Sequence, residues 1–280
     1  MTKVHAISTG RVQVRRPQME SRGNGPISRL GHMLFDPDWS EWLPIHVWII
    51  EHDEGLIVVD TGETARVHER GYHPRWHPFN RRAVHFSVHP EEELGPQLRA
   101  LGIGPRDVRQ VVLTHLHTDH AGGLFHVTGS RAWVAPGEFK SATAMTGRVM
   151  GYLPHRWPKW WQPDFIRFDR RAVGRFEEAM PLTSRGDVLI VPTPGHTPHH
   201  VSVLVLGEPS LLLAGDTSYT QDLLLAGKID GVSPDQRVAR DTHARILALA
   251  KERPLVYLPS HDPESAARLA AGSVLPGNKP

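Results

Sequence analysis

The sequence of 280 residues contains no cysteine, which excludes disulfide bonds. It also lacks any apolar run near the roughly 18 residues that a membrane span needs. The segment 1–8 has no apolar core of the kind found in secretory signals, and the chain shows no internal repeat or low-complexity tract. These absences predict a cytoplasmic protein without membrane insertion.

A strong excess of charge of one sign is absent as well. Lysine and arginine number 32 and aspartate and glutamate 30, so the formal net charge is +2. This balance does not favour a basic surface for nucleic acid, and we expect no nucleic-acid partner. Because 39% of the residues are hydrophobic, the chain can bury a core, and its length suits one domain over residues 1–280.

Three histidines and an aspartate crowd into six residues directly after the apolar run 111–113. They are His115, His117, Asp119 and His120. Imidazole and carboxylate groups suit a borderline divalent ion such as zinc. Without a cation, so many polar groups in one partly buried turn would cost free energy. The spacing therefore predicts a metal site at the end of a strand.

Further His and Asp residues follow other apolar runs in the same way. His196, Asp216 and His261 come after the runs 188–191, 211–214 and 255–258. Repeated hydrophobic strands that end in turns with His or Asp are typical of a site built from loops at one edge of a sheet sandwich.

With these motifs, the chain resembles the metallo-β-lactamase superfamily over roughly residues 40 to 265. The resemblance rests on His-x-His-x-Asp-His, on Pro-Gly-His-Thr around His196, on the Gly-Asp turn and on the late histidine. It implies an α/β fold, an αββα sandwich with a site for two divalent metals. We expect Zn²⁺, with Co²⁺, Fe²⁺ or Mn²⁺ as alternatives.

The resemblance also implies which residues hold each metal. One metal would be held by His115, His117 and His196, and the other by Asp119, His120 and His261. Asp216 would bridge both.

Two branches of the superfamily are disfavoured. The absence of cysteine rules out the ligand set of zinc β-lactamases that place Cys between the two late histidines. The diiron flavoproteins have Glu where this chain has His117, and 280 residues leave no room for a flavin-binding domain.

The segment 215–220 is similar to the N-acyl homoserine lactone hydrolases, the quorum-quenching lactonases, which carry a Tyr three residues after the bridging Asp. Here that residue is Tyr219. The segments 260–264 and 42–62 are similar to their last ligand segment and first hairpin. The implied substrate is an acylated lactone, and the resemblance also implies a homodimer.

The expected mechanism is attack by a hydroxide that bridges the two metals. Tyr219 would donate a hydrogen bond to the developing oxyanion, and Asp119 would hold the nucleophile and carry a proton to the leaving alkoxide. The alternative for Tyr219 is packing at a helix start with its hydroxyl in water.

Supporting roles are expected for Asp60, which follows a predicted strand, and for His200. Asp60 would orient a ligand, or it would simply cap a turn. His199 stands where the family usually has a glycine able to take positive φ, which puts the local turn in question.

The segment 138–180 crowds aromatic and methionine residues into an irregular stretch. One hypothesis makes it a lid whose Met150, Trp157, Trp160 and Trp161 line a channel for an acyl chain. The other hypotheses are a packing or dimer contact, and a surface that stacks single-stranded nucleic acid.

The remaining chain is predicted in outline. Residues 1–40 suggest a strand and then an irregular loop, or a nucleic-acid-binding arm, and 44–51 with 56–60 suggest a hairpin. Helices are expected at 89–101, 241–251 and 265–271. Leu94, Leu98 and Leu101 would share one face of the first, and Ile246, Leu247 and Leu249 would be buried in the second.

Two rival functions remain open. Organophosphate triesters, glutathione thioesters or other esters could be hydrolysed at the same site, because fold resemblance alone does not choose a substrate. A non-catalytic metal-binding or interaction protein could also have kept the fold.

Overall fold

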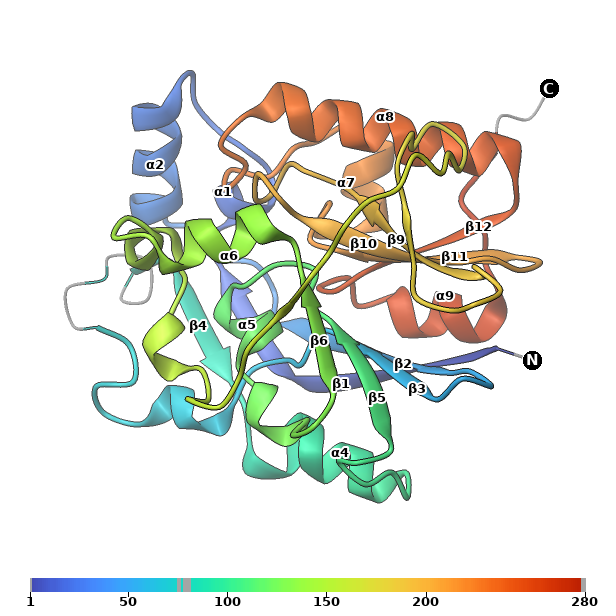
Figure 1. Ribbon diagram of the computed structural model, residues 1–280. Coiled ribbons are helices and arrows are strands. Elements are labelled where there is room, and N and C mark those ends of the chain that lie inside the picture. Colours follow the sequence, from blue (N-terminus) through green and yellow to red (C-terminus); the bar gives the residue numbers. More distant parts are fainter. Residues whose placement is uncertain (1, 75–76, 78–81, 278–280) are drawn as a thin grey trace.

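Two β-sheets form the centre of the molecule in the computed structural model, which describes residues 2–74, 77 and 82–277. The first sheet has seven strands in the order β4-β1-β2-β3-β5-β6-β7, and the second has five in the order β12-β11-β10-β9-β8 (Figure 1). The strands are β1 (Lys3–Val14), β2 (Leu43–Glu51), β3 (Leu56–Val59), β4 (Val84–Ser87), β5 (Val108–Val112), β6 (Arg131–Val134), β7 (Asp164–Phe165), β8 (Met180–Pro181), β9 (Val188–Pro192), β10 (Val201–Val205), β11 (Ser210–Gly215) and β12 (Leu255–Pro259).

The central strands of the two sheets bury both of their faces, and this creates three apolar layers. In β2, Val47 and Ile49 join the cluster outside the first sheet, whereas Trp48 and Ile50 join the cluster between the sheets. The same alternation runs through β9 and β12 of the second sheet. Because side chains along a strand point to opposite faces, continuous apolar strands require a covering layer on each side.

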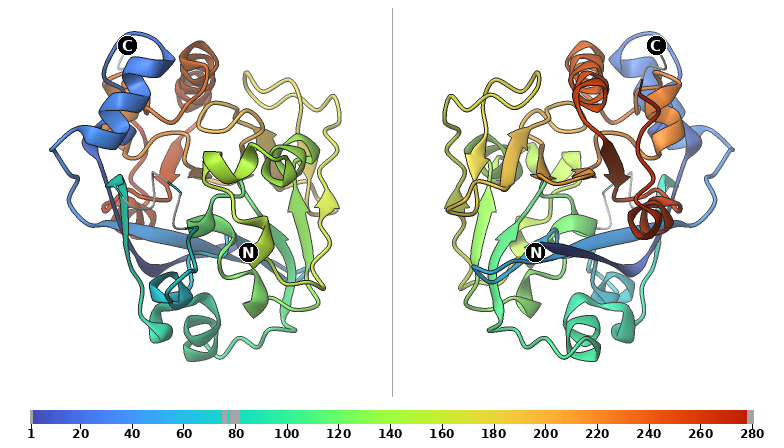
Figure 2. Two further views of the ribbon diagram at one scale, coloured as in Figure 1. Left: turned by 90° about the vertical axis from the view of Figure 1, so that its left-hand side faces the viewer. Right: turned by 90° about the vertical axis from the view of Figure 1, so that its right-hand side faces the viewer.

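Helices supply the two outer layers. Leu94 and Leu98 of α4 (Leu94–Ala100) pack on the first sheet, and Ile246 and Leu249 of α8 (Gln236–Glu252) pack on the second. Figure 2 shows these helices on opposite sides of the sandwich. The predicted αββα arrangement is confirmed.

The other α-helices have between 4 and 10 residues. They are α1 (Arg16–Met19), α2 (Pro26–Phe35), α5 (Thr118–Ala121), α6 (Pro136–Thr143), α7 (Gln221–Leu225) and α9 (Ser265–Ala271), with 3₁₀ turns η1 (Ala65–His68), η2 (Pro90–Glu92), η3 (Leu124–His126), η4 (Gly147–Met150) and η5 (Pro154–Arg156). Within the described ranges, none of the helices is long and apolar enough to span a membrane.

Several predicted elements need correction. The expected irregular loop within residues 1–40 contains α1 and α2, each of which begins with a proline in its first turn. The expected helix 89–101 is divided by the extended residue Glu93, and Leu101 is 50% exposed because it lies beyond the end of α4. The hairpin of β2 and β3 and the helix 265–271 are confirmed.

One further helix begins earlier than predicted. The helix expected at 241–251 is α8, which starts at Gln236 after the side chain of Asp235 caps its N-terminus. Ile246 and Leu249 are buried as expected, but Leu247 is only partly buried at the margin of the same cluster.

Candidate metal centre

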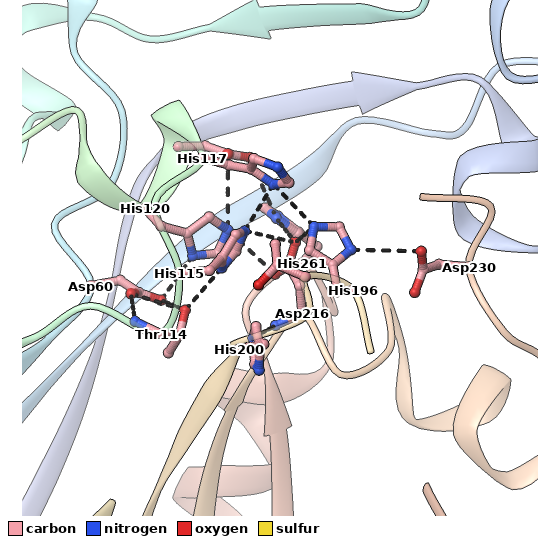
Figure 3. Close-up of polar contacts among 12 residues, drawn as sticks. Asp60, Thr114, His115, His117, His120, His196, His200, Asp216, Asp230 and His261 are labelled. Carbon is pink, nitrogen blue, oxygen red and sulfur yellow. Dashed lines mark hydrogen bonds and ion pairs between the residues drawn. The ribbon is translucent and has the colours of Figure 1, made fainter. Parts of the chain in front are cut away.

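The seven predicted ligands meet where strands of both sheets end, and Figure 3 labels all of them except Asp119. His115 and His117 follow β5, and Asp119 and His120 lie in α5. The remaining three ligands, His196, Asp216 and His261, follow β9, β11 and β12 of the second sheet. Strands β11 and β12 are parallel, and β9 runs in the same direction through antiparallel β10, so their carboxyl ends share one edge.

Three imidazoles form the first group of ligand atoms. Nδ1 of His117 lies 3.0 Å from Nε2 of His115 and 3.1 Å from Nε2 of His196. All three atoms fall within the spacing of a common metal ion. We call these residues the imidazole half of the centre.

A carboxylate and two imidazoles form the second group. Nε2 of His261 lies 3.5 Å from Oδ2 of Asp119, and Nε2 of His120 lies 3.9 Å from Oδ1 of Asp119. We call these residues the mixed half.

Asp216 lies between the two halves. Its Oδ2 is 3.5 Å from Nε2 of His196 and 3.4 Å from Nε2 of His261, and its Oδ1 is 3.3 Å from Nε2 of His120. A carboxylate in this position can contact ions in both halves, as expected of a bridging ligand.

The ring partners of the histidines indicate that a cation fits here. Nδ1–H of His120 donates to Asp60, Nδ1–H of His261 to the Pro44 carbonyl, and Nε2–H of His117 to the Met150 carbonyl. Each ring therefore turns its other nitrogen towards the cluster.

Nδ1 of His115 faces the Thr114 hydroxyl, which itself donates to Asp60. Nδ1 of His196 faces Asp230 at 3.6 Å, so these two rings also turn Nε2 inward. Nε2 of His120 and Oδ1 of Asp216 are buried without a hydrogen-bond partner. Converging nitrogens and orphaned buried atoms of this kind are compensated by a metal ion.

Burial and charge act in opposite directions on these groups. Burial lowers the pKa of His117 to about 3 and, with the neighbouring His120 and His117, lowers that of His115. Burial also lowers the pKa of His261, but Asp216 and Asp119 outweigh it and raise the pKa overall. The carboxylates thus draw positive charge into the mixed half, and a divalent cation can supply it in place of protons.

Asp60 holds part of this arrangement at a conformational cost. It is the one non-glycine residue with positive φ among the described residues, at 63°. Its Oδ1 accepts from the Thr114 backbone N–H at 2.8 Å, and its Oδ2 accepts from His120 at 2.8 Å. Left-handed backbone at an aspartate costs free energy that its buried hydrogen bonds must offset. Asp60 is therefore hydrogen-bonded to one of the predicted metal ligands, His120.

His200 acts on Asp216 through the backbone. Nε2 of His200 accepts from the Asp216 N–H at 3.0 Å, while its Nδ1 contacts the Thr193 hydroxyl at 2.9 Å. Gly215 between them has φ 55°, and a Cβ there would lie 2.5 Å from Nε2 of His200. Only glycine fits this turn. His199 does not have positive φ, so replacement of the usual glycine leaves the turn intact.

A cavity of about 350 Å³ opens beside the cluster. Asp119 and Tyr219 line it together with ligands of both halves. Tyr219 is nearly buried, and its ring stacks on His261 with centroids 5.6 Å apart. Burial, then the charges of Asp216, Asp230 and Asp119, raises the pKa of Tyr219, so its hydroxyl keeps its proton.

A known protein family matches most of this chain. The model of the metallo-beta-lactamase superfamily matches residues 40–261. The chain belongs to this superfamily.

Relatives in this superfamily include proteins with named activities. The N-acyl homoserine lactonase AttM of Azorhizobium caulinodans is 29% identical over 243 residues, which cover 80% of this chain and 83% of AttM. A probable metallo-hydrolase of Mycobacterium tuberculosis is also 29% identical, over 240 residues that cover 78% of this chain and 74% of that protein.

A solved structure shares the fold. It is an N-acyl homoserine lactone hydrolase with the product N-hexanoyl-L-homoserine bound at its catalytic metal centre. The TM-score is 0.72 at 23% sequence identity, and the match covers 94% of both chains.

In the present chain, the three tryptophans predicted to line an acyl channel do not line the cavity. Trp157 and Trp161 pack on each other and on Phe139, in the apolar cluster that also contains Leu116, and Trp160 is about half exposed. Among the described residues, the cavity wall includes Met150 but none of the three tryptophans. Trp157 and Trp161 pack in the apolar cluster outside the first sheet instead, and Trp160 belongs neither to that cluster nor to the cavity wall.

Most of the apolar cavity wall is formed by segments other than residues 138–180. It includes Val12, Val14, Leu30, Met33, Val84 and Phe86 of β1, α2 and β4, far from residues 138–180 in sequence, in addition to Met150. The irregular appearance of the N-terminal sequence concealed this role.

Two buried acidic residues of the site were not predicted. Asp230 faces His196 and accepts from the Ser233 backbone N–H at 2.6 Å, and Glu138 is buried below the imidazole half. Asp230 lies in a loop without a strand before it, and Glu138 lies within a short helix. Neither showed the strand-end pattern that identified the ligands.

Proposed function

We propose that this chain opens the lactone ring of N-acyl homoserine lactones with two divalent metal ions, preferably Zn²⁺. One observation carries the proposal: the seven metal-ligand candidates form one cluster, and five of them line a single cavity together with Tyr219 and an apolar wall. The names of the relatives support a lactone substrate.

Bound at the two halves, the metals would supply a hydroxide at neutral pH and polarise the substrate carbonyl. The chain's own residues would do the rest. The protonated hydroxyl of Tyr219 donates a hydrogen bond to the oxygen that becomes negative when the ring carbonyl is attacked. Tyr219 does not act as a base, because its raised pKa keeps the hydroxyl protonated.

Asp119 is suited to move the proton. Its side chain is 15% exposed, and it lines the cavity while contacting both histidines of the mixed half. We assign it the proton released by the nucleophile, which it passes to the alkoxide oxygen as the ester C–O bond breaks. The products are the carboxylate and the hydroxyl of the opened ring.

The apolar wall would hold the acyl chain. Met33 is buried against the backbone of Gly231, and Phe86 and Val84 lie on β4 at the same wall. Burial of methylene groups there stabilises longer chains by roughly 0.8 kcal/mol per CH₂.

The test is hydrolysis of an N-acyl homoserine lactone series by protein loaded with zinc or cobalt, followed by acid release. Paraoxon and a simple aryl ester serve as comparison substrates. The proposal expects fast lactone opening that a chelator abolishes and added metal restores. Turnover of the ester or phosphotriester without lactone opening would assign the chain to another hydrolase activity of the superfamily.

A homodimer is part of the proposal as well. Mass measurement in dilute solution is its check, because a value matching the 31.3 kDa chain would contradict it.

A further inference from the structure

Glu138 is a buried carboxylate on which the segments of the imidazole half converge. It lies near the start of α6 and is 0% exposed. Its Oε1 accepts from the Leu116 backbone N–H at 3.2 Å and from the Tyr152 hydroxyl at 2.9 Å. Its Oε2 accepts from the Thr197 hydroxyl at 2.8 Å. One side chain thus joins three separate segments.

Each of these partners adjoins a ligand of the imidazole half. Leu116 stands between His115 and His117, and Thr197 directly follows His196. Tyr152 pairs with His117 through a backbone bridge, and their rings lie 5.0 Å apart. Because the turn after β5 and the turn after β9 follow strands of different sheets, Glu138 links the two sheets at the point where the three candidate ligand nitrogens converge.

The mixed half lacks this link. None of the hydrogen bonds described for Glu138 reaches a neighbour of Asp119, His120 or His261. His120 is held by Asp60, and His261 by the Pro44 carbonyl. Glu138 therefore supports the imidazole half alone, whereas Asp60 holds His120 directly and reaches His115 only through the Thr114 hydroxyl.

We propose that Glu138 is a positioning residue that sets the metal affinity of the imidazole half alone. The inference rests on the two-metal centre of the proposed function. Loss of the carboxylate leaves a buried N–H and two buried hydroxyls without their acceptor, so the turns shift to find new partners. Groups that orient metal ligands from behind typically change metal affinity 10- to 100-fold.

The experiment compares Glu138→Ala with Glu93→Ala in the full chain. Glu93 is a matched control, since it is also buried and accepts three hydrogen bonds, from Thr64, Ala65 and His126. Competition between the protein and a chromogenic chelator for Zn²⁺ gives two dissociation constants. Glu138→Ala should raise one of them about 10- to 100-fold and leave the other within about twofold. Glu93→Ala should change neither.

The conservative variant separates positioning from loss of fold. In Glu138→Gln, the amide oxygen can still accept from Leu116 and Tyr152, and the amide NH₂ can donate to the Thr197 hydroxyl. Both dissociation constants should return to within about twofold of the parent values.

Two ligand variants identify the affected half. In a His261→Ala background, where the imidazole half remains, adding Glu138→Ala should again weaken the remaining metal 10- to 100-fold. In a His196→Ala background, adding Glu138→Ala should have no further effect.

Equal weakening of both metals by Glu138→Ala, or no weakening of either, would overturn the inference while leaving the two-metal centre in place. A parent chain that bound no metal would overturn both. If Glu138→Ala did not fold, Tyr152→Phe and Thr197→Val each remove one bond and should weaken one metal about two- to tenfold. Unchanged constants in both variants would contradict the role.

Discussion

The two halves of the metal centre differ in how their ligands are held. The three residues of the imidazole half include no carboxylate. Glu138 of α6 joins the two turns that carry them through hydrogen bonds to Leu116 and Thr197. The mixed half contains Asp119, and its His120 rests on the charged Asp60. A cation gains more from nearby negative charge in a buried place than from neutral nitrogens. The mixed half should therefore bind its metal more tightly, whereas the imidazole half depends on precise geometry.

Removal of the shared ligand tests the comparison most severely. Asp216→Ala takes a carboxylate from both halves, so metal content should fall in each and lactone turnover should drop at least about a thousandfold, since the metals contribute several kcal/mol. Elemental analysis and kinetics measure the two effects. Retention of two tightly bound metals would show that Asp216 does not bridge.

Substitution of Tyr219 tests catalysis separately from metal binding. Tyr219→Phe should keep both metals and reduce kcat about 100- to 1000-fold, the loss expected for one oxyanion donor. Metal content measured on the same samples serves as the control. Parent-like lactone turnover would remove Tyr219 from the mechanism.

Substitution of Asp60 tests the mixed half, as substitution of Glu138 tests the imidazole half. Asp60→Asn keeps a side chain that tolerates positive φ but removes the negative charge next to His120. The metal of the mixed half should bind about 10- to 100-fold more weakly, and that of the imidazole half should weaken less, because Asp60 reaches His115 only through the Thr114 hydroxyl. Chelator competition in the His196→Ala background would isolate the mixed half. Weakening of the other half instead would contradict the division.

The smallest effect concerns the substrate. Met33→Ala should reduce kcat/KM for a long-chain lactone about tenfold relative to a short-chain one, because one apolar contact contributes 1–3 kcal/mol. Trp160→Ala is the control, and the ratio should not change, since Trp160 does not line the cavity. A shift of the ratio only in Trp160→Ala would return the acyl site to residues 138–180.

Local sequence patterns identified the candidate ligands well. Each of the strands before His115, His196, Asp216 and His261 has apolar residues in its second half, and polar residues occupy the turn that follows. Metal chemistry limits the ligand types, and strand ends limit where they can stand, so both features are visible in one dimension. The alternation of β2 between two cores likewise follows from the strand period.

Contacts between segments distant in sequence escaped prediction. Trp157 and Trp161 are as hydrophobic as Met33, yet only Met33 reaches the cavity. Composition does not reveal which apolar surface a large side chain covers, because burial depends on partners from other elements.

The sequence by itself determined the candidate ligands, the apolar strands and the superfamily, since these depend on residue type and spacing along the chain. Only the tertiary structure decided that β1, α2 and β4 form the apolar wall, that Asp60 supports His120, and that Glu138 supports the imidazole half. The physical reason is that hydrogen-bond partners and cavity walls arise where the sheets and helices pack together, and local sequence patterns do not encode those distances.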